Sequence, residues 1–138
     1  KNINIDTEGA KLVCTTDYDY SELNYTLGSK YVVFADDKEK VTKVISGEVI
    51  YSTDKTKLDD FENYLNQNHD AAAKYNGYTY DIKREKNKVT SSVTIDYSEF
   101  DMKKFLDDNE SNDKEELTLD SIEKKYVSLG AKCERKND

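Results

Sequence analysis

The chain contains two cysteines, Cys14 near its start and Cys133 near its end, and no others. A disulfide between them would close nearly the whole chain into one loop. Two thiols accompanied by a single histidine fit a structural bridge better than a metal site or a redox centre. We therefore expect a Cys14–Cys133 disulfide, and the alternative is two unrelated buried thiols.

The length of 138 residues suits one domain with one core. Apolar and charged residues each make up 36% of the chain, which would indicate disorder if the apolar residues were scattered. They instead form strand-length and helix-length patterns, and eleven Tyr and four Phe supply bulky contacts. We expect a single extracytoplasmic domain over residues 1–138, with residues 1–10 as a flexible N-terminal tether.

The net charge of −8 argues against nucleic-acid binding, which needs Lys and Arg to replace the counterions of the phosphates. It also disfavours docking on an anionic membrane, while it would suit cationic partners or divalent ions. No segment approaches the roughly 20 apolar residues that span a bilayer. Because the sequence begins at Lys1 rather than Met, we expect an upstream signal peptide, lipoprotein leader or membrane anchor, which would place the cysteines in an oxidising compartment.

Alternating apolar residues predict strands at 11–16, 23–34 and 41–51. Gly28-Ser29 either divides the second strand or marks a bulge. In the third, the apolar residues Val41, Ile45, Val49 and Tyr51 share one parity, as expected of a half-buried strand. Two further alternating runs, 78–82 and 89–97, are separated by a polar turn and predict a β-hairpin.

A spacing of three to four residues between apolar positions predicts a long helix at 55–75, ended by Asn76-Gly77. Asp101 would cap a short helix, the polar stretch 107–116 reads as a loop, and Asp120 with Glu123 resembles the capping box of a last helix. Residues 131–134 would return as an edge strand beside the first strand. The sequence thus predicts an α+β fold: an antiparallel sheet of five or six strands packed on one face by two or three helices.

The only histidine, His69, falls among polar residues of the long helix, and we interpret it as a solvated side chain. The acidic pairs Asp17/Asp19, Asp36/Asp37 and Asp107/Asp108 raise a calcium alternative. EF-hand spacing fails, because a loop that starts at Asp107 places Asn112 where glycine is needed and Thr118 where a bidentate glutamate is needed. We therefore expect no metal and no cofactor.

No catalytic motif is visible, since the five glycines are isolated and neither a nucleophile elbow nor an H-E-x-x-H helix occurs. A carboxylate-based hydrolase remains an alternative, because a sequence does not show the separation of carboxylates. Exposed tyrosines on a sheet stack on sugars or anchor protein partners. An interaction surface would involve Tyr18, Tyr20, Tyr78 and Tyr80, and ordinary cross-strand packing is the competing explanation.

The segment Val93-Thr94-Ile95-Asp96-Tyr97-Ser98-Glu99-Phe100-Asp101-Met102-Lys103-Lys104, with Glu48-Val49-Ile50-Tyr51 before it and Ser121-Ile122-Glu123-Lys124 after it, resembles the YehR-like family of small bacterial lipoproteins, a domain of unknown function. The resemblance covers roughly residues 10–135, and its motifs are short. The cysteine pair departs from that pattern and looks more like a variant in secreted or anchored proteins of Gram-positive bacteria. The resemblance implies an extracytoplasmic α+β domain tethered through its N-terminus, and it implies no activity.

From these observations we expect a monomeric, non-enzymatic binding or interaction module of the cell envelope, with a protein or another envelope component as its partner. The alternatives are a small ligand or calcium held on the acidic loops, and the carboxylate-based hydrolase.

Overall fold

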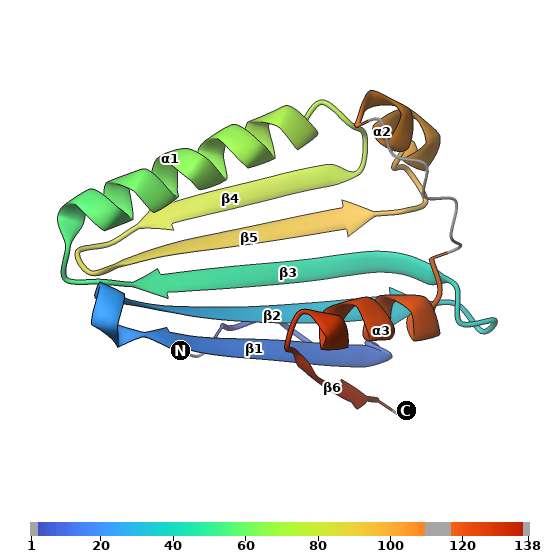
Figure 1. Cartoon of the computed structure of the whole chain (residues 1–138). Coiled ribbons are helices and arrows are strands. Elements are labelled where there is room, and N and C mark those ends of the chain that lie inside the picture. The colour runs from blue at the N-terminus through green and yellow to red at the C-terminus, as the bar shows by residue number, and fades with distance from the viewer. Residues whose placement is uncertain (1–2, 110–116, 137–138) are drawn as a thin grey trace.

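The computed structural model describes residues 3–109 and 117–136, and its centre is an antiparallel sheet with strand order β4-β5-β3-β2-β1-β6 (Figure 1). The predicted α+β class is confirmed. The strands are β1 (Leu12–Tyr20), β2 (Tyr25–Ala35), β3 (Val41–Tyr51), β4 (Tyr78–Arg84), β5 (Lys88–Asp96) and β6 (Lys132–Arg135), and the helices are α1 (Lys55–Ala72), α2 (Met102–Asp108) and α3 (Leu119–Ser128). A 3-10 turn, Ser21–Leu23, links β1 to β2.

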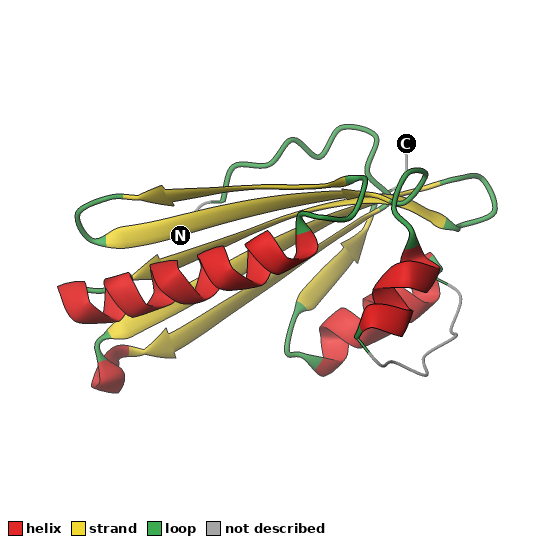
Figure 2. Cartoon of the chain, turned by 90° about the horizontal axis from the view of Figure 1, so that it is seen from above, coloured by secondary structure: helices red, strands yellow, loops and turns green. Residues whose placement is uncertain are grey.

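The three helices lie on one side of the sheet, here called the helix face, and the N-terminal segment crosses the other side, the back face (Figure 2). Successive strand residues alternate between these faces. The register of the strand pairs places even residues of β1, β3 and β4 on the helix face, together with odd residues of β2, β5 and β6. This assignment gives the face of the sheet on which each strand side chain lies.

The expectation of a half-buried third strand is wrong, because β3 is buried on both faces. Val44 and Ile50 point to the helix face and belong to its apolar clusters. Val49 and Gly47, of the opposite parity, are also buried. Burial on the back face depends on a segment far away in the sequence, which alternation within one strand does not reveal.

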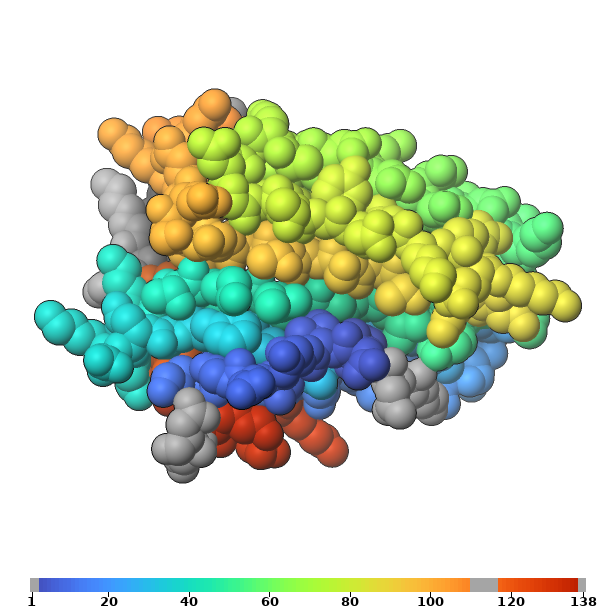
Figure 3. Space-filling model, turned by 180° about the vertical axis from the view of Figure 1, so that it is seen from behind, coloured from blue at the N-terminus to red at the C-terminus, as the bar shows by residue number. Residues whose placement is uncertain are grey.

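That segment is residues 3–10, which run along the back face (Figure 3). A Cβ atom on Gly47 would lie 2.6 Å from Ile3 Cγ2 and 3.3 Å from Ile5 Cδ1, so the glycine makes room for this crossing. The N-terminal segment therefore packs on the sheet from Ile3 onward. Of the expected flexible tether 1–10, residues 1 and 2 lie outside the described part of the chain, and its mobility stays a prediction.

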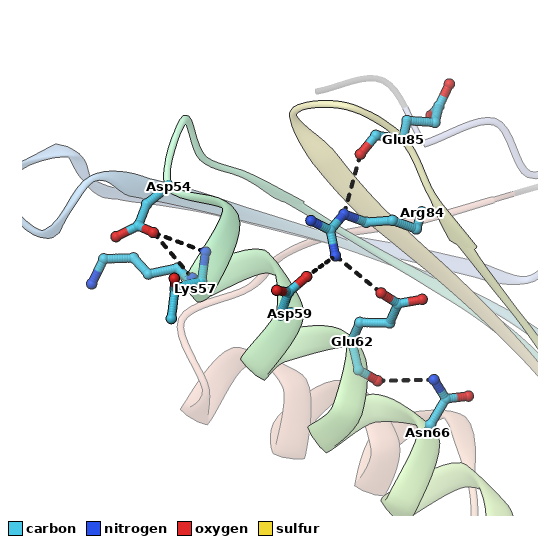
Figure 4. A network of polar contacts seen from close by, with 8 residues as sticks. Asp54, Lys57, Asp59, Glu62, Asn66, Arg84 and Glu85 are labelled. Atoms are coloured by element: carbon cyan, nitrogen blue, oxygen red, sulfur yellow. Dashed lines mark hydrogen bonds and ion pairs between the residues drawn. The ribbon is translucent and has the colours of Figure 1, made fainter.

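Helix α1 starts where Asp54 accepts hydrogen bonds from the backbone amides of Thr56 and Lys57, at 2.9 and 3.4 Å. It ends at Ala72, three residues earlier than expected, and the chain turns at Gly77, where φ is +81°. The helix is tied to the outer strand β4 by Arg84, whose Nη1 lies 2.7 Å from Asp59 and 3.0 Å from Glu62 (Figure 4).

The predicted capping box of α3 is displaced by two residues. Thr118, not Asp120, is the N-cap, and it exchanges side-chain-to-backbone hydrogen bonds with Ser121. Asp120 and Glu123 instead bind Arg135 of β6, at 2.7 and 2.9 Å. The acidic residues that suggested a cap therefore fasten the last strand to the helix before it.

Strand β6 pairs antiparallel with the first half of β1, which confirms that the two ends of the chain meet. Cys14 lies directly opposite Cys133 with a Cα–Cα distance of 4.0 Å, and the two form a disulfide across 119 positions of sequence. In β2 the pairing with β3 passes Gly28 without interruption, and the register shift falls at Phe34/Ala35 instead. The second segment is thus one long strand.

The apolar residues of the helix face form two clusters at opposite ends of the sheet. The first lies under α3 and contains Leu12, Cys14, Val33, Val41, Val44, Leu119, Ile122 and Ala131. The second lies under α1 and contains Ile50, Leu58, Leu65 and Val89. Between them the strands carry polar side chains, so the core is divided.

Candidate binding strip on the helix face

The division between the two clusters is a row of polar residues that crosses four neighbouring strands at one level. Thr16 pairs with Ser29, Ser29 with Glu48, and Glu48 with Ser91, all with side chains on the helix face. Directly opposite residues of an antiparallel pair have Cβ atoms about 5 Å apart. We call Thr16, Ser29, Glu48 and Ser91 the polar strip.

The strip is largely removed from solvent. Thr16, Ser29 and Ser91 are 8%, 6% and 2% exposed, and Glu48 is half-buried. Burial raises the pKa of the Glu48 carboxyl, because a desolvated site disfavours the charged form. Among the described residues no hydrogen bond or ion pair compensates this carboxylate.

A second polar group of the strip also lacks a hydrogen-bond partner. Thr16 Oγ1 is buried and makes no hydrogen bond with any described residue. Buried hydroxyls almost always have a partner in folded proteins, and an exception marks a place where water or a ligand is expected. The strip therefore holds two groups that a bound molecule could satisfy.

Two tyrosines lie on the side of the strip toward the first apolar cluster, Tyr31 one level away on β2 and Tyr78 two levels away on β4. Burial is the largest cause of a raised pKa at Tyr31, where a hydrogen bond with Ser29 opposes it and the charge of Glu48 adds to it. Burial, followed by the charges of Tyr80 and Glu48, raises the pKa of Tyr78 to about 12. Both phenols therefore lie within the electrostatic reach of the Glu48 carboxylate. The Tyr31 ring also stacks on Tyr126 of α3, with centroids 4.2 Å apart.

His69 corrects the sequence interpretation, because it is not solvated but 9% exposed. Its Nδ1 lies 2.7 Å from the Tyr78 hydroxyl, and its ring stacks on Tyr80 with centroids 5.1 Å apart. Burial lowers the pKa of the imidazole. His69 Nε2 is, with Thr16 Oγ1, one of two buried side-chain atoms without a partner among the described residues. The sequence did contain a signal, since His69 follows Leu65 by one helical turn.

The four tyrosines expected to form an interaction surface share the helix face but do not meet. Tyr18 and Tyr20 lie on β1 and stack at 6.1 Å, whereas Tyr78 and Tyr80 lie on β4, with β2, β3 and β5 in between. The hydroxyl of Tyr18 donates to the Leu129 carbonyl and that of Tyr80 to Asp70. Only Tyr20, at 39%, is highly exposed. Their part in binding stays a prediction.

One member of each acidic pair accepts hydrogen bonds within the described chain. Asp19 accepts from the Ser21 amide, Asp36 accepts from the amides of Lys38 and Lys40, and Asp108 accepts from the Tyr75 hydroxyl at 2.7 Å. Within residues 3–109 and 117–136, no three His, Cys, Asp or Glu side chains come together as metal ligands would. Most of the loop at 107–116, used to test EF-hand spacing, lies outside the described residues.

Two open hollows flank the N-terminal segment on the back face. One, of about 730 Å³, is lined by Ile3, Asn4, Asp17, Gly28 and Lys30, and Thr16 and Ser29 also line it. The other, of about 340 Å³, lies beside Gly47, Val49 and Lys88. The described polar groups that lack partners, however, are on the helix face. We therefore favour the strip as the functional site.

Sequence reasoning missed the strip entirely. Glu48 begins the segment Glu48-Val49-Ile50-Tyr51 that supports the family resemblance, but nothing singled out its carboxylate among 29 acidic residues, and the serines and threonine carried no motif. A signal did exist, because β3 interrupts its apolar helix-face positions Val44 and Ile50 with Ser46 and Glu48. Only the strand register shows that Ser29, Ser91 and Thr16 extend this interruption across the sheet.

A scan of family models and a search of curated proteins give no match for this sequence. Among solved structures, the YehR protein of E. coli, determined by NMR, superposes with a TM-score of 0.60 at 18% identity, covering 93% of this chain and 94% of that one. A protein from Streptococcus pneumoniae TIGR4, also determined by NMR, gives a TM-score of 0.49 at 12% identity, covering 97% and 92%. The first similarity shows that this chain shares the fold of YehR.

None of the described helices combines the length and the hydrophobicity needed to cross a bilayer.

Proposed function

We propose that this chain is an extracytoplasmic, envelope-associated domain that binds a ligand and catalyses no reaction, and that its polar strip is the binding surface. The fold shared with YehR is compatible with this proposal and assigns no activity. The proposal also retains the N-terminal lipid or membrane attachment that the sequence resemblance implies.

One observation carries the binding proposal: polar groups without partners are concentrated at one level of the helix face. Thr16 Oγ1 is buried without a hydrogen bond, and the same level carries Glu48 two strands away, also unpaired within the described chain. A buried polar group without a partner costs about 1–3 kcal/mol, more when it is charged. A surface that keeps such groups between two apolar clusters is better explained by a ligand than by stability.

The non-enzymatic part rests on the composition of the strip. Hydrolysis by paired carboxylates needs a second carboxylate beside the first. On the described helix face, the residues opposite Glu48 are serines, and Arg84 holds Asp59 and Glu62 at the end of the sheet near the start of α1. Glu48 therefore suits recognition of charge better than proton transfer in a reaction.

The extracytoplasmic part rests on the disulfide, since such bonds persist in oxidising compartments. In intact host cells, a membrane-impermeant reductant followed by a membrane-impermeant maleimide should label Cys14 and Cys133, and the maleimide without reduction should label neither. Labelling that appears only after lysis would place the domain in the cytoplasm and refute this part of the proposal.

The binding part is tested by NMR with amide-resolved spectra of the wild-type domain and a panel of amines, amino acids, sugars, carboxylates and divalent cations. We expect at least one class to shift the amides of Ser29, Glu48 and Ser91 together, and to lose this effect in a Thr16→Val, Glu48→Gln double variant. A panel that moves none of these amides would contradict the proposal.

A further inference from the structure

Glu48 brings a negative charge into a half-buried site whose neighbours are neutral. It projects from the middle of β3 toward the helix face, where β2 and β5 flank it. The residues opposite and diagonal to it on those strands are Ser29, Ser91, Leu27, Tyr31, Val89 and Val93. The described chain thus offers no cation to this carboxylate, and a cation from outside would complete it.

Thr16 gives an independent indication of a missing ligand. It is more than nine-tenths buried, it occupies the level of Glu48 two strands away, and its Oγ1 has no partner in the described chain. Ser29 lies between the two. A hydroxyl both donates and accepts hydrogen bonds, so Thr16 can serve a ligand that carries a donor.

An aromatic ring is the third feature of the site, beside the Glu48 carboxylate and the Thr16 hydroxyl. Tyr31 lies one level along β2 from Ser29, and its ring is fixed by stacking on Tyr126. Tyr78 lies farther away, two levels along the sheet on the outer strand β4, with its hydroxyl 2.7 Å from His69 Nδ1. The faces of aromatic rings attract cations, more strongly where water is excluded. A cation beside Glu48 would therefore meet a carboxylate, hydroxyls and the Tyr31 ring.

This set of groups distinguishes among cations. Calcium takes six to eight oxygen ligands, usually with several carboxylates, whereas the strip supplies one carboxylate. An ammonium group needs only a few acceptors for its N–H groups, and its hydrocarbon chain can pack on apolar side chains and rings. Leu27, Val89 and Val93 provide such a surface beside Glu48.

We propose that the polar strip binds an organic ammonium group, with the Glu48 carboxylate accepting its charge-assisted hydrogen bond and Tyr31 beside it. This inference rests on the proposed binding function and adds the class of ligand. The ammonium group can come from a small free amine or from the lysine side chain of a protein partner, which share this chemistry.

The test is an NMR titration of the wild-type domain with two probes, n-butylammonium and N-acetyl-lysine methylamide. N-acetyl-norleucine methylamide is the matched neutral control, because it keeps the apolar chain and lacks the ammonium. We expect both ammonium probes to shift the amides of Ser29, Glu48 and Ser91, and the norleucine control to leave them unchanged. Equal shifts from the control would show apolar binding only and overturn the inference.

A pair of variants provides the second arm. Glu48→Gln removes the carboxylate from the strip, and Asp17→Asn removes one from the back face of β1, where it is exposed. Losing a charge-assisted hydrogen bond should weaken ammonium binding about tenfold or more in Glu48→Gln. Asp17→Asn should bind as wild type does. Unchanged binding in Glu48→Gln, or equal weakening in both variants, would overturn the inference.

The two probes also separate the sources of the ammonium. Tighter binding of the lysine derivative than of n-butylammonium would indicate a lysine side chain of a protein, and equal or weaker binding would indicate a small amine. If neither probe binds but another class shifts the strip amides, the ammonium inference fails and the binding function stands. If no class binds, both fail.

Discussion

The two ends of the helix face are held together by different means. Under α3, the first apolar cluster includes half of a disulfide, and Arg135 of β6 lies within 4 Å of Glu39, Asp120 and Glu123. Under α1, the second cluster is smaller and the connection to the outer strand is ionic, through Arg84. The covalent end thus fixes β6 to β1, and the other end depends on packing and on the ion pairs of Arg84.

The difference shows how the polar strip is tolerated. A half-buried carboxylate and an unpaired hydroxyl weaken the middle of a core, and the apolar clusters on either side must offset that cost. The disulfide contributes by restricting the unfolded chain, independently of contacts in the folded state. Each cluster can therefore be weakened separately to learn how far the two ends depend on each other.

The largest expected effect comes from removing the disulfide. In Cys14→Ser, Cys133→Ser the closure across 119 positions is lost, and stability should fall by about 3–5 kcal/mol. Urea unfolding of the reduced and oxidised wild type gives the same comparison without mutation. Hydrogen exchange should increase first in β6 and the start of β1. Equal urea midpoints for the two redox states would show that the disulfide does not stabilise the domain.

At the other end, Leu58→Ala should lower the free energy of unfolding by about 3 kcal/mol. Leu58 of α1 is fully buried against the sheet, and the substitution leaves a cavity there. Its counterpart in the first cluster is Ile122→Ala. If the strip separates the two clusters, the stability loss of the double variant should equal the sum of the two single losses to within about 0.5 kcal/mol. A larger coupling would show one continuous core. Urea unfolding of the four proteins in the cycle gives these values.

Between the ends, Glu48→Gln should stabilise the domain at neutral pH, by an amount on the order of 1 kcal/mol. Burial raises the pKa of the Glu48 carboxyl above its ordinary value of 4.5. The folded state therefore holds this proton more tightly than the unfolded state, and stability falls as pH rises from 4.5 through the raised pKa. The variant should lose this decline.

The measurement is the difference in unfolding free energy between Glu48→Gln and wild type from pH 4 to pH 8. A difference that does not change with pH would mean that Glu48 is as solvated as a free carboxyl. Asp17→Asn, at an exposed position, controls for the general effect of removing one negative charge.

The smallest effects are expected at the two arginines. Arg84→Met and Arg135→Met each remove ion pairs with partly exposed carboxylates, and such pairs contribute about 0.2–1 kcal/mol that salt reduces. Both losses should shrink in 1 M NaCl. A loss above about 2 kcal/mol at either site would show that the ionic contacts, and not only the clusters, hold that end together.

The sequence by itself determined the elements whose signals are local. Asp54 and Asp101 begin their helices as N-caps do, and the alternation in 78–82 and 89–97 produces the β4–β5 hairpin. Residues 131–134 return as an edge strand beside the first. These features depend on hydrogen bonds and side-chain periods within a few residues, which a single sequence displays.

Only the tertiary structure decided which residues gather across strands. Burial of β3 on both faces follows from the N-terminal segment over Gly47, and burial of His69 follows from its packing on β4. The polar strip exists because register sets Thr16, Ser29, Glu48 and Ser91 at one level. A shift of one residue in any pairing would send that strand's member to the back face, and such alignment is a property of strands far apart in the chain.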